Sequence, residues 1–127
     1  MYPFLATVSK NHGAGVGLNN SINTYEESQM AIAEISIVPI GTSTTSISAF
    51  VADAVRLLKD SKLNYELTAM GTIIEGDLTD IMNILIKMHE TPFDKGASRV
   101  YSVIKIDDRR DKPTGIQNKV KSVENKL

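Results

Sequence analysis

The stretch YELTAMGTIIEGD, residues 65–77, holds two short strand-like segments on either side of a break. Residues 65–68 and 72–75 contain the aromatic and β-branched side chains that favour strands. Met70 and Gly71 lie between them, and a glycine allows the backbone to bend or to form a tight hairpin. The final Gly-Asp leads into a helical pattern. The stretch therefore predicts two strands joined by a bend, followed directly by a helix.

Amphipathic helices are predicted before and after this pair of strands. On the N-terminal side, apolar residues recur at helical spacing from residue 47 to about residue 61, and Ser46 is a suitable N-cap. On the C-terminal side, a second apolar stripe covers residues 78–89. Pro92 and Gly96 are expected to end this second helix.

A further strand is predicted at each end of this region. Residues 32–38 alternate, so that Ile35 and Ile37 face one side of a sheet while Glu34 and its polar neighbour Ser36 face the other. Residues 100–106 are strongly β-branched, which also favours a strand.

The predicted order is βαββαβ, followed by a short C-terminal helix over residues 116–127. This order is that of the ferredoxin-like fold, an α+β sandwich with a four-stranded antiparallel sheet and two helices on one face. Because two helices cover only one face, the other must meet water, a ligand or another subunit.

Residues 1–29 differ in composition from residues 30–127. They are rich in Asn, Ser and Gly and lack apolar periodicity, whereas the strand pattern begins sharply at Met30. The two Glu codons shortly before Met30 can also spell a ribosome-binding sequence, which would make Met30 the native start. We therefore expect a single domain over residues 30–127, preceded by a flexible extension that is not part of the fold.

The composition excludes several classes of site. The chain has 127 residues, 42% of them hydrophobic, and a net charge of −1, so it has no general attraction for nucleic acid or for an anionic membrane. No segment approaches the roughly 20 apolar residues of a membrane span. The absence of cysteine excludes disulfides and thiolate metal sites and suits a cytoplasmic protein. We expect no metal and no cofactor, and a structural or solvated role for His89.

Several stretches resemble the signature sequences of the thiamine-binding protein family, which belongs to the YkoF-like superfamily of ferredoxin-like domains. The resemblance covers residues 30–127, with one departure at Ala69, where members often have proline. It rests on AEISIVPIGT (33–42), YELTAMGTIIEGD (65–77), IKIDDRRDK (104–112) and KVKSVENKL (119–127). The resemblance implies a small cytoplasmic homo-oligomer, a dimer or tetramer, that binds thiamine or its hydroxymethylpyrimidine moiety without catalysis.

Thiamine presents two chemical demands to a binding site. Its aminopyrimidine needs a matched hydrogen-bond donor and acceptor, and its cationic thiazolium favours a carboxylate or an aromatic face. The residues expected to supply these groups are Glu34, Ser36, Thr68, Met70, Gly71, Thr72 and Glu75. The two threonines have a second interpretation as ordinary strand residues. Glu75 also has a second interpretation, as a favourable negative charge at the start of the following helix.

The charged run that follows the last strand has two interpretations as well. A solvated cluster is the simpler one, because exposed ion pairs contribute only about 0–1 kcal/mol each. The family resemblance instead implies a subunit interface, because this run leads into a C-terminal helix of a kind that packs against neighbouring subunits. The expected interface residues are Asp107, Asp108, Arg109 and Arg110.

Three other functions compete with thiamine binding. A regulatory or assembly module that binds another metabolite or protein is the main alternative, since this fold hosts many functions. RNA binding is disfavoured because the central strands lack stacking aromatics and residues 30–127 carry 13 basic and 13 acidic side chains. An enzyme is disfavoured because no set of nucleophile and base is evident.

Overall fold

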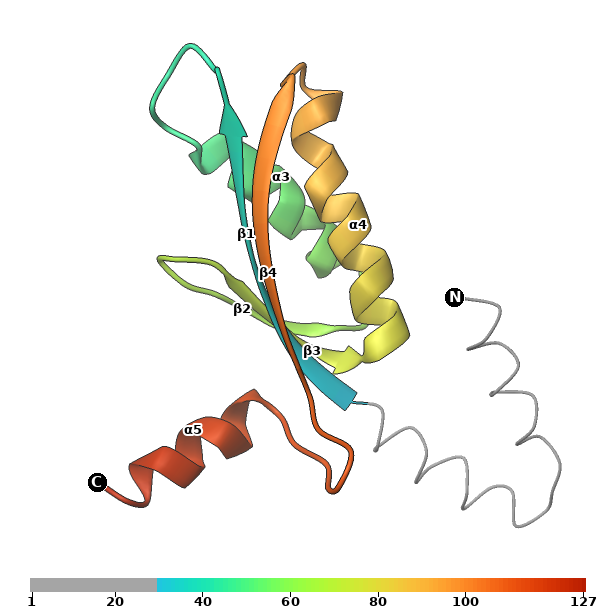
Figure 1. Cartoon of the computed structure of the whole chain (residues 1–127), viewed down its shortest axis with the longest axis vertical. Coiled ribbons are helices and arrows are strands. Elements are labelled where there is room, and N and C mark those ends of the chain that lie inside the picture. The colour runs from blue at the N-terminus through green and yellow to red at the C-terminus, as the bar shows by residue number, and fades with distance from the viewer. Residues whose placement is uncertain (1–29) are drawn as a thin grey trace, which may run out of the picture.

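The computed structural model describes residues 30–127, which form one four-stranded antiparallel sheet with helices (Figure 1). The strand order is β2-β3-β1-β4. The expected extension, residues 1–29, lies outside the described residues. The elements are β1 (Met30–Ile40), α3 (Ser48–Lys59), β2 (Asn64–Leu67), β3 (Thr72–Asp77), α4 (Leu78–Asp94), β4 (Arg99–Asp108) and α5 (Ile116–Glu124). The predicted ferredoxin-like βαββαβ order with a C-terminal helix is confirmed.

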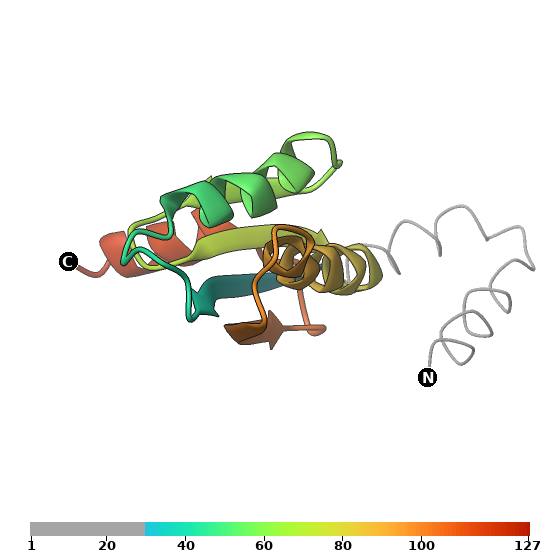
Figure 2. The ribbon, with the colours of Figure 1, turned by 90° about the horizontal axis from the view of Figure 1, so that it is seen from above.

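The hydrophobic core lies between the sheet and the two helices α3 and α4, which cover the same face (Figure 2). On β1, every second residue from Ala31 to Pro39 is buried, and Ile35 and Ile37 face the helices as expected. Glu34 and Ser36 lie on the opposite, open face. This alternation follows from the two-residue period of a strand.

The neighbours of β1 differ in length, and this divides the strand into two parts. The pairing of β3 with β1 begins where Asp77 lies opposite Met30 and stops where Thr72 lies opposite Ile35. The pairing of β4 with β1 continues to the end of the strand, where Arg99 lies opposite Ile40. Within the described part of the chain, residues 36–40 of β1 therefore have no strand on the side of β3. The place of a strand there is taken by the bend between β2 and β3 and by α3.

The predicted ends of the two helices need correction. Ser46 is not an N-cap, because α3 begins at Ser48, its N-cap is Ile47, and no side chain caps it. Pro92 does not end α4 but lies buried inside the last turn, which runs to Asp94. A proline in the last turn loses only one backbone N–H, and burial of its ring compensates for that loss.

The predicted start of α4 at the Gly-Asp pair and its end before Gly96 are correct, and the structure adds a side-chain cap. Asp77 caps α4, because its Oδ2 accepts a hydrogen bond from the backbone N–H of Asp80 at 3.1 Å. Gly96 follows the end of α4 with a φ of 96°, a left-handed conformation that glycine adopts without strain. His89 has a structural setting, since its Nδ1 lies 2.7 Å from the Ser102 hydroxyl and its ring contacts Phe93 edge-on.

The open face of the sheet and the edge strand β4 expose apolar side chains. Tyr101 is 61% exposed, and its neighbour Val103 on the same face is also exposed. The helices do not cover all of β4 on the other face either, and leave Ile104 and Ile106 exposed. In the range 30–127, none of the helices has the length and apolar character needed to cross a bilayer.

Candidate functional site

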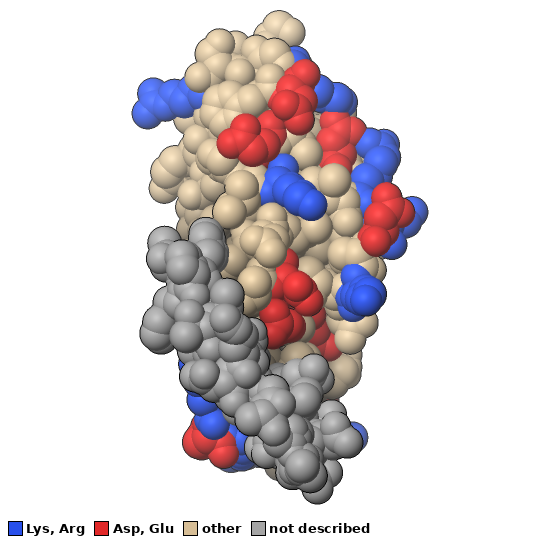
Figure 3. All heavy atoms as spheres, turned by 90° about the vertical axis from the view of Figure 1, so that its right-hand side faces the viewer, with Lys and Arg blue, Asp and Glu red and all other residues tan. Residues whose placement is uncertain are grey.

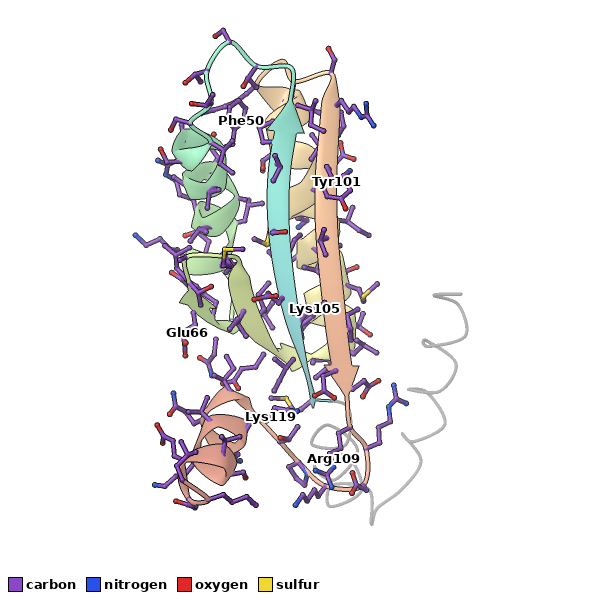
Figure 4. The ribbon with its side chains drawn as sticks, turned by 60° about the vertical axis from the view of Figure 1, so that its left-hand side comes forward. Phe50, Glu66, Tyr101, Lys105, Arg109 and Lys119 are labelled. Carbon is purple, nitrogen blue, oxygen red and sulfur yellow. The ribbon has the colours of Figure 1, made fainter. Side chains whose placement is uncertain are left out.

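A cavity of about 170 Å³ lies where β3 stops and β1 continues. One wall is β1 over residues 35–38, and another is the end of the β2–β3 hairpin over residues 67–72. The apolar side chains of α3 close it, among them Val51, Ala54 and Val55. The cavity thus occupies the notch left by unequal strand lengths, and it reaches from the core to the open face of the sheet. Figure 4 shows the hairpin beside β1.

Five of the seven residues expected to bind a ligand line this cavity. They are Ser36, Thr68, Met70, Gly71 and Thr72. The structure therefore brings together residues from β1 and from the hairpin that are more than 30 positions apart in sequence. The α3 side chains of the wall were not expected in the site, because their helical spacing gave them the ordinary signature of a core stripe.

Thr72 is a buried polar residue without a complete set of partners. It is 3% exposed and is the one buried polar or charged residue in the range 30–127. Its backbone takes part in the sheet, but its hydroxyl has no hydrogen-bond partner among the described residues. A buried hydroxyl without a partner costs about 1–3 kcal/mol of stability. Because this hydroxyl borders the cavity, a ligand there could supply the missing partner.

Thr68 has a different role, because its hydroxyl is already occupied. It donates to the carbonyl of Gly71 at 2.7 Å and accepts from the backbone N–H groups of Met70 and Gly71 at 3.3 and 3.2 Å. The Thr68 N–H also donates to the Gly71 carbonyl at 2.9 Å. Thr68 therefore holds the bend in shape, which places Met70, 82% exposed, at the rim of the cavity.

Gly71 lets the hairpin approach β1 closely. A Cβ atom at this position would lie 3.1 Å from the Ile35 carbonyl oxygen and 3.1 Å from Cγ of Glu34. Glu34 does not line the cavity, but its side chain lies against the hairpin beside it. Its Oε1 forms an ion pair of 2.9 Å with Nζ of Lys105, which projects from β4 on the open face (Figure 4).

Glu75 lies outside the cavity, at the other end of β3. Its Oε1 accepts a hydrogen bond from the N–H of Ile116, the first residue of α5, at 2.7 Å. Its Oε2 accepts from Nδ2 of Asn64 at 3.2 Å. The carboxylate therefore sits at the start of a helix, but this helix is α5 and not α4, whose start is capped by Asp77. No sequence signal links residues 41 positions apart, so this role was missed.

The charged run after β4 pairs within the chain. Asp107 binds Nζ of Lys119 at 2.5 Å, and Asp108 binds Arg110 at 2.7 Å. Arg109 and Asp111 form a two-bond pair of 2.5 and 2.8 Å, and this hydrogen bonding lowers the pKa of Asp111 to about 2. The expected interface role of residues 107–110 stays a prediction, since only one chain is described.

Comparison with known proteins places this geometry in a family. YqgV of Bacillus subtilis, a UPF0045 protein, is 48% identical over 102 residues, which cover 77% of this chain and 98% of the relative. A UPF0045 protein of Methanothermobacter thermautotrophicus is 43% identical over 99 residues, 77% of this chain and 100% of the relative. The crystal structure of MJ1052 from Methanocaldococcus jannaschii matches with a TM-score of 0.71 at 38% identity, over 76% of this chain and 97% of that one.

The sequence profile of the family described as thiamine-binding protein matches residues 33–124. This range holds both the cavity in the notch of the sheet and all of α5. The chain therefore belongs to the thiamine-binding protein family.

Proposed function

We propose that this protein binds thiamine without catalysis and encloses the aminopyrimidine ring in the cavity beside β1. The observation that carries the proposal is the buried Thr72 hydroxyl, which borders the cavity and has no partner among the described residues. Membership of the thiamine-binding protein family supports the choice of ligand. A carrier, buffer or sensor of thiamine or of its hydroxymethylpyrimidine moiety would need binding of this kind.

The size of the cavity suits one aromatic ring. An apolar cavity of about 150 Å³ is enough to bind benzene, and this one measures about 170 Å³. The walls are mainly apolar, and the Thr72 and Ser36 hydroxyls supply polar groups for the ring nitrogens and the amino group. The backbone edge of β1 over residues 36–40, which pairs with no strand of the described chain on the side of β3, offers further polar groups.

The thiazolium ring would then lie outside the cavity, toward the open face. Glu34 is the carboxylate placed to attract its positive charge, because the Glu34 side chain lies against Gly71 at the cavity. Of the residues that the structure describes, none that lines the cavity itself is ionisable. An environment without an acid or a base favours binding over acid–base catalysis.

We also propose that the protein works as a homo-oligomer, at least a dimer. The exposed apolar residues Tyr101 and Val103 on the open face and Ile104 on the edge strand support this, since a monomer would leave them in water. The neighbouring charged residues 107–110 would then lie at the interface. Light scattering at micromolar concentration should give a multiple of the 13.9 kDa chain mass, and a monomer would contradict this proposal.

The Thr72→Val variant tests the ligand site, because it removes the hydroxyl and keeps the shape. Binding of thiamine and of hydroxymethylpyrimidine, measured by calorimetry, should weaken by up to about tenfold, the value of one neutral hydrogen bond. The ligand-free variant should be more stable than the wild type by about 1 kcal/mol, because an unpartnered buried hydroxyl is gone.

The matched control is Thr79→Val, a half-buried threonine of α4 that does not line the cavity. It should leave both affinities unchanged. Unchanged affinity in Thr72→Val would remove Thr72 from the site. If neither compound binds the wild type, the proposal of thiamine binding is wrong. The alternative is then the regulatory or assembly module that binds another metabolite or protein.

A further inference from the structure

A second concave surface lies at the other end of the molecule, between the loop after β4 and α5. We call it the basic groove and define it by its four cationic side chains, Arg109, Lys112, Lys119 and Lys121. Among residues 30–127 no carboxylate lines it. The rest of its lining is polar at Thr114, Asn118, Ser122 and Asn125 and apolar at Pro113 and Val123. Figure 4 shows Arg109 on the loop and Lys119 on the helix.

The sequence distributes charge unevenly around this groove. Residues 109–127 carry six basic and two acidic side chains, whereas residues 30–108 carry seven basic and eleven acidic ones. The side of the molecule shown in Figure 3 has blue and red side chains interspersed. The C-terminal region is therefore positive against an acidic body, and a concave surface focuses such a potential.

Among the described residues, two of the four cations form a salt bridge and two do not, although the charge of Lys112 also acts on Asp111 and helps to lower the pKa of that carboxyl. Arg109 is paired with Asp111, and Lys119 with Asp107. Lys112 and Lys121 form no salt bridge in the range 30–127. The groove thus offers two ammonium groups together with hydroxyl and amide donors, which is the donor set that phosphate oxygens accept from.

We propose that the basic groove binds a small phosphorylated molecule through its phosphate or diphosphate group. The groove is open to solvent on one side and has a volume of about 600 Å³, within the usual range of roughly 300–1,000 Å³ for small-molecule sites. It shares no lining residue with the cavity beside β1. The proposal is therefore independent of thiamine binding, and either can fail without the other.

A small ligand fits these observations better than nucleic acid does. The groove lies on a helix of only nine residues and the adjoining loop. Binding of a nucleic acid strand depends on many phosphate contacts and usually on stacking aromatics. In the described part of the chain, no aromatic side chain lines the groove.

Inorganic pyrophosphate is the probe for the test, with phosphate for comparison, on the full chain at about 0.15 M salt. Calorimetry should detect pyrophosphate binding that is tighter than phosphate binding, because the larger anion can contact both lysines. The variant K112A/K121A should weaken pyrophosphate binding at least about tenfold. The matched control K59A/K62A removes two exposed lysines outside the groove and should change binding less than about twofold.

The same variants separate this site from the cavity. K112A/K121A should keep wild-type affinity for thiamine, and T72V should keep wild-type affinity for pyrophosphate. Equal pyrophosphate binding by wild type and K112A/K121A would overturn the proposal, as would no binding to the wild type. Loss of oligomer mass in K112A/K121A without any pyrophosphate binding would also overturn it and would make the groove a contact for the acidic surface of another copy.

Discussion

The polar groups near the two ends of β1 differ in whether they have hydrogen-bond or ion-pair partners within the described chain. At its N-terminal end, β1 is flanked by strands on both sides, and nearby carboxylates are occupied: Glu75 holds Ile116 and Asp107 holds Lys119. At its C-terminal end, β1 has a strand on one side only, and the buried Thr72 hydroxyl at the boundary has no partner in the described chain. Polar groups that are satisfied within the chain stabilise the fold, whereas unsatisfied ones at a cavity are available to a ligand.

The largest expected effect is on ligand binding at the C-terminal end of β1. Ala54→Leu adds a bulky side chain where Ala54, 1% exposed, borders the cavity. Thiamine binding should fall by more than about 100-fold, because the ring and the new side chain compete for one space. Stability should change little, because the side chain fills a void.

The control is Ala33→Leu, at a position on β1 that is equally buried but does not border the cavity. Overpacking there should lower the free energy of unfolding by about 1–3 kcal/mol. Denaturant unfolding and calorimetry would measure both variants. Thiamine binding retained by Ala54→Leu would show that the cavity is not the ligand site.

A smaller effect, on the free energy of unfolding alone, is expected at the N-terminal end of β1. Glu75→Ala removes the acceptor of the Ile116 N–H at the start of α5 and that of Asn64. The free energy of unfolding should fall by about 1–2 kcal/mol, as for loss of a cap with a charged acceptor. Affinity for thiamine should stay close to that of the wild type. A large loss of affinity in a folded variant would restore Glu75 to the ligand site.

The smallest effect concerns the exposed pair of Arg109 and Asp111. Arg109 lowers the pKa of Asp111 from 3.8 to about 2, so the folded state favours the charged carboxylate. The pair therefore contributes its stabilisation above pH 3.8, and this contribution is lost as the pH falls toward 2. An NMR titration should find Asp111 titrating near pH 2 in the wild type and at a higher pH in Arg109→Ala, where a backbone hydrogen bond and Lys112 still lower its pKa. Identical titrations would show that the pair does not form in solution.

Sequence periodicity was enough to predict the helices and strands of residues 30–127 in their correct order. The apolar residues of β1 alternate, those of α3 and α4 recur at helical spacing, and Gly71 marks the bend between β2 and β3. These are local patterns, which depend on residues a few positions apart. Local patterns were less reliable at helix ends, where Pro92 continued α4 because burial of its ring mattered more than its missing N–H.

Five expected ligand residues do line one cavity, because the bend and the open face of β1 could both be inferred from sequence. The sequence by itself thus determined the fold, the family and the neighbourhood of the candidate site. Only the tertiary structure decided which side chains are free. Thr68 and Thr72 have the same chemistry, yet Thr68 holds the bend, whereas Thr72 is buried and its hydroxyl has no partner within residues 30–127. That difference, like the contact between Glu75 and Ile116, depends on strand register and on packing between distant segments, which no local pattern encodes.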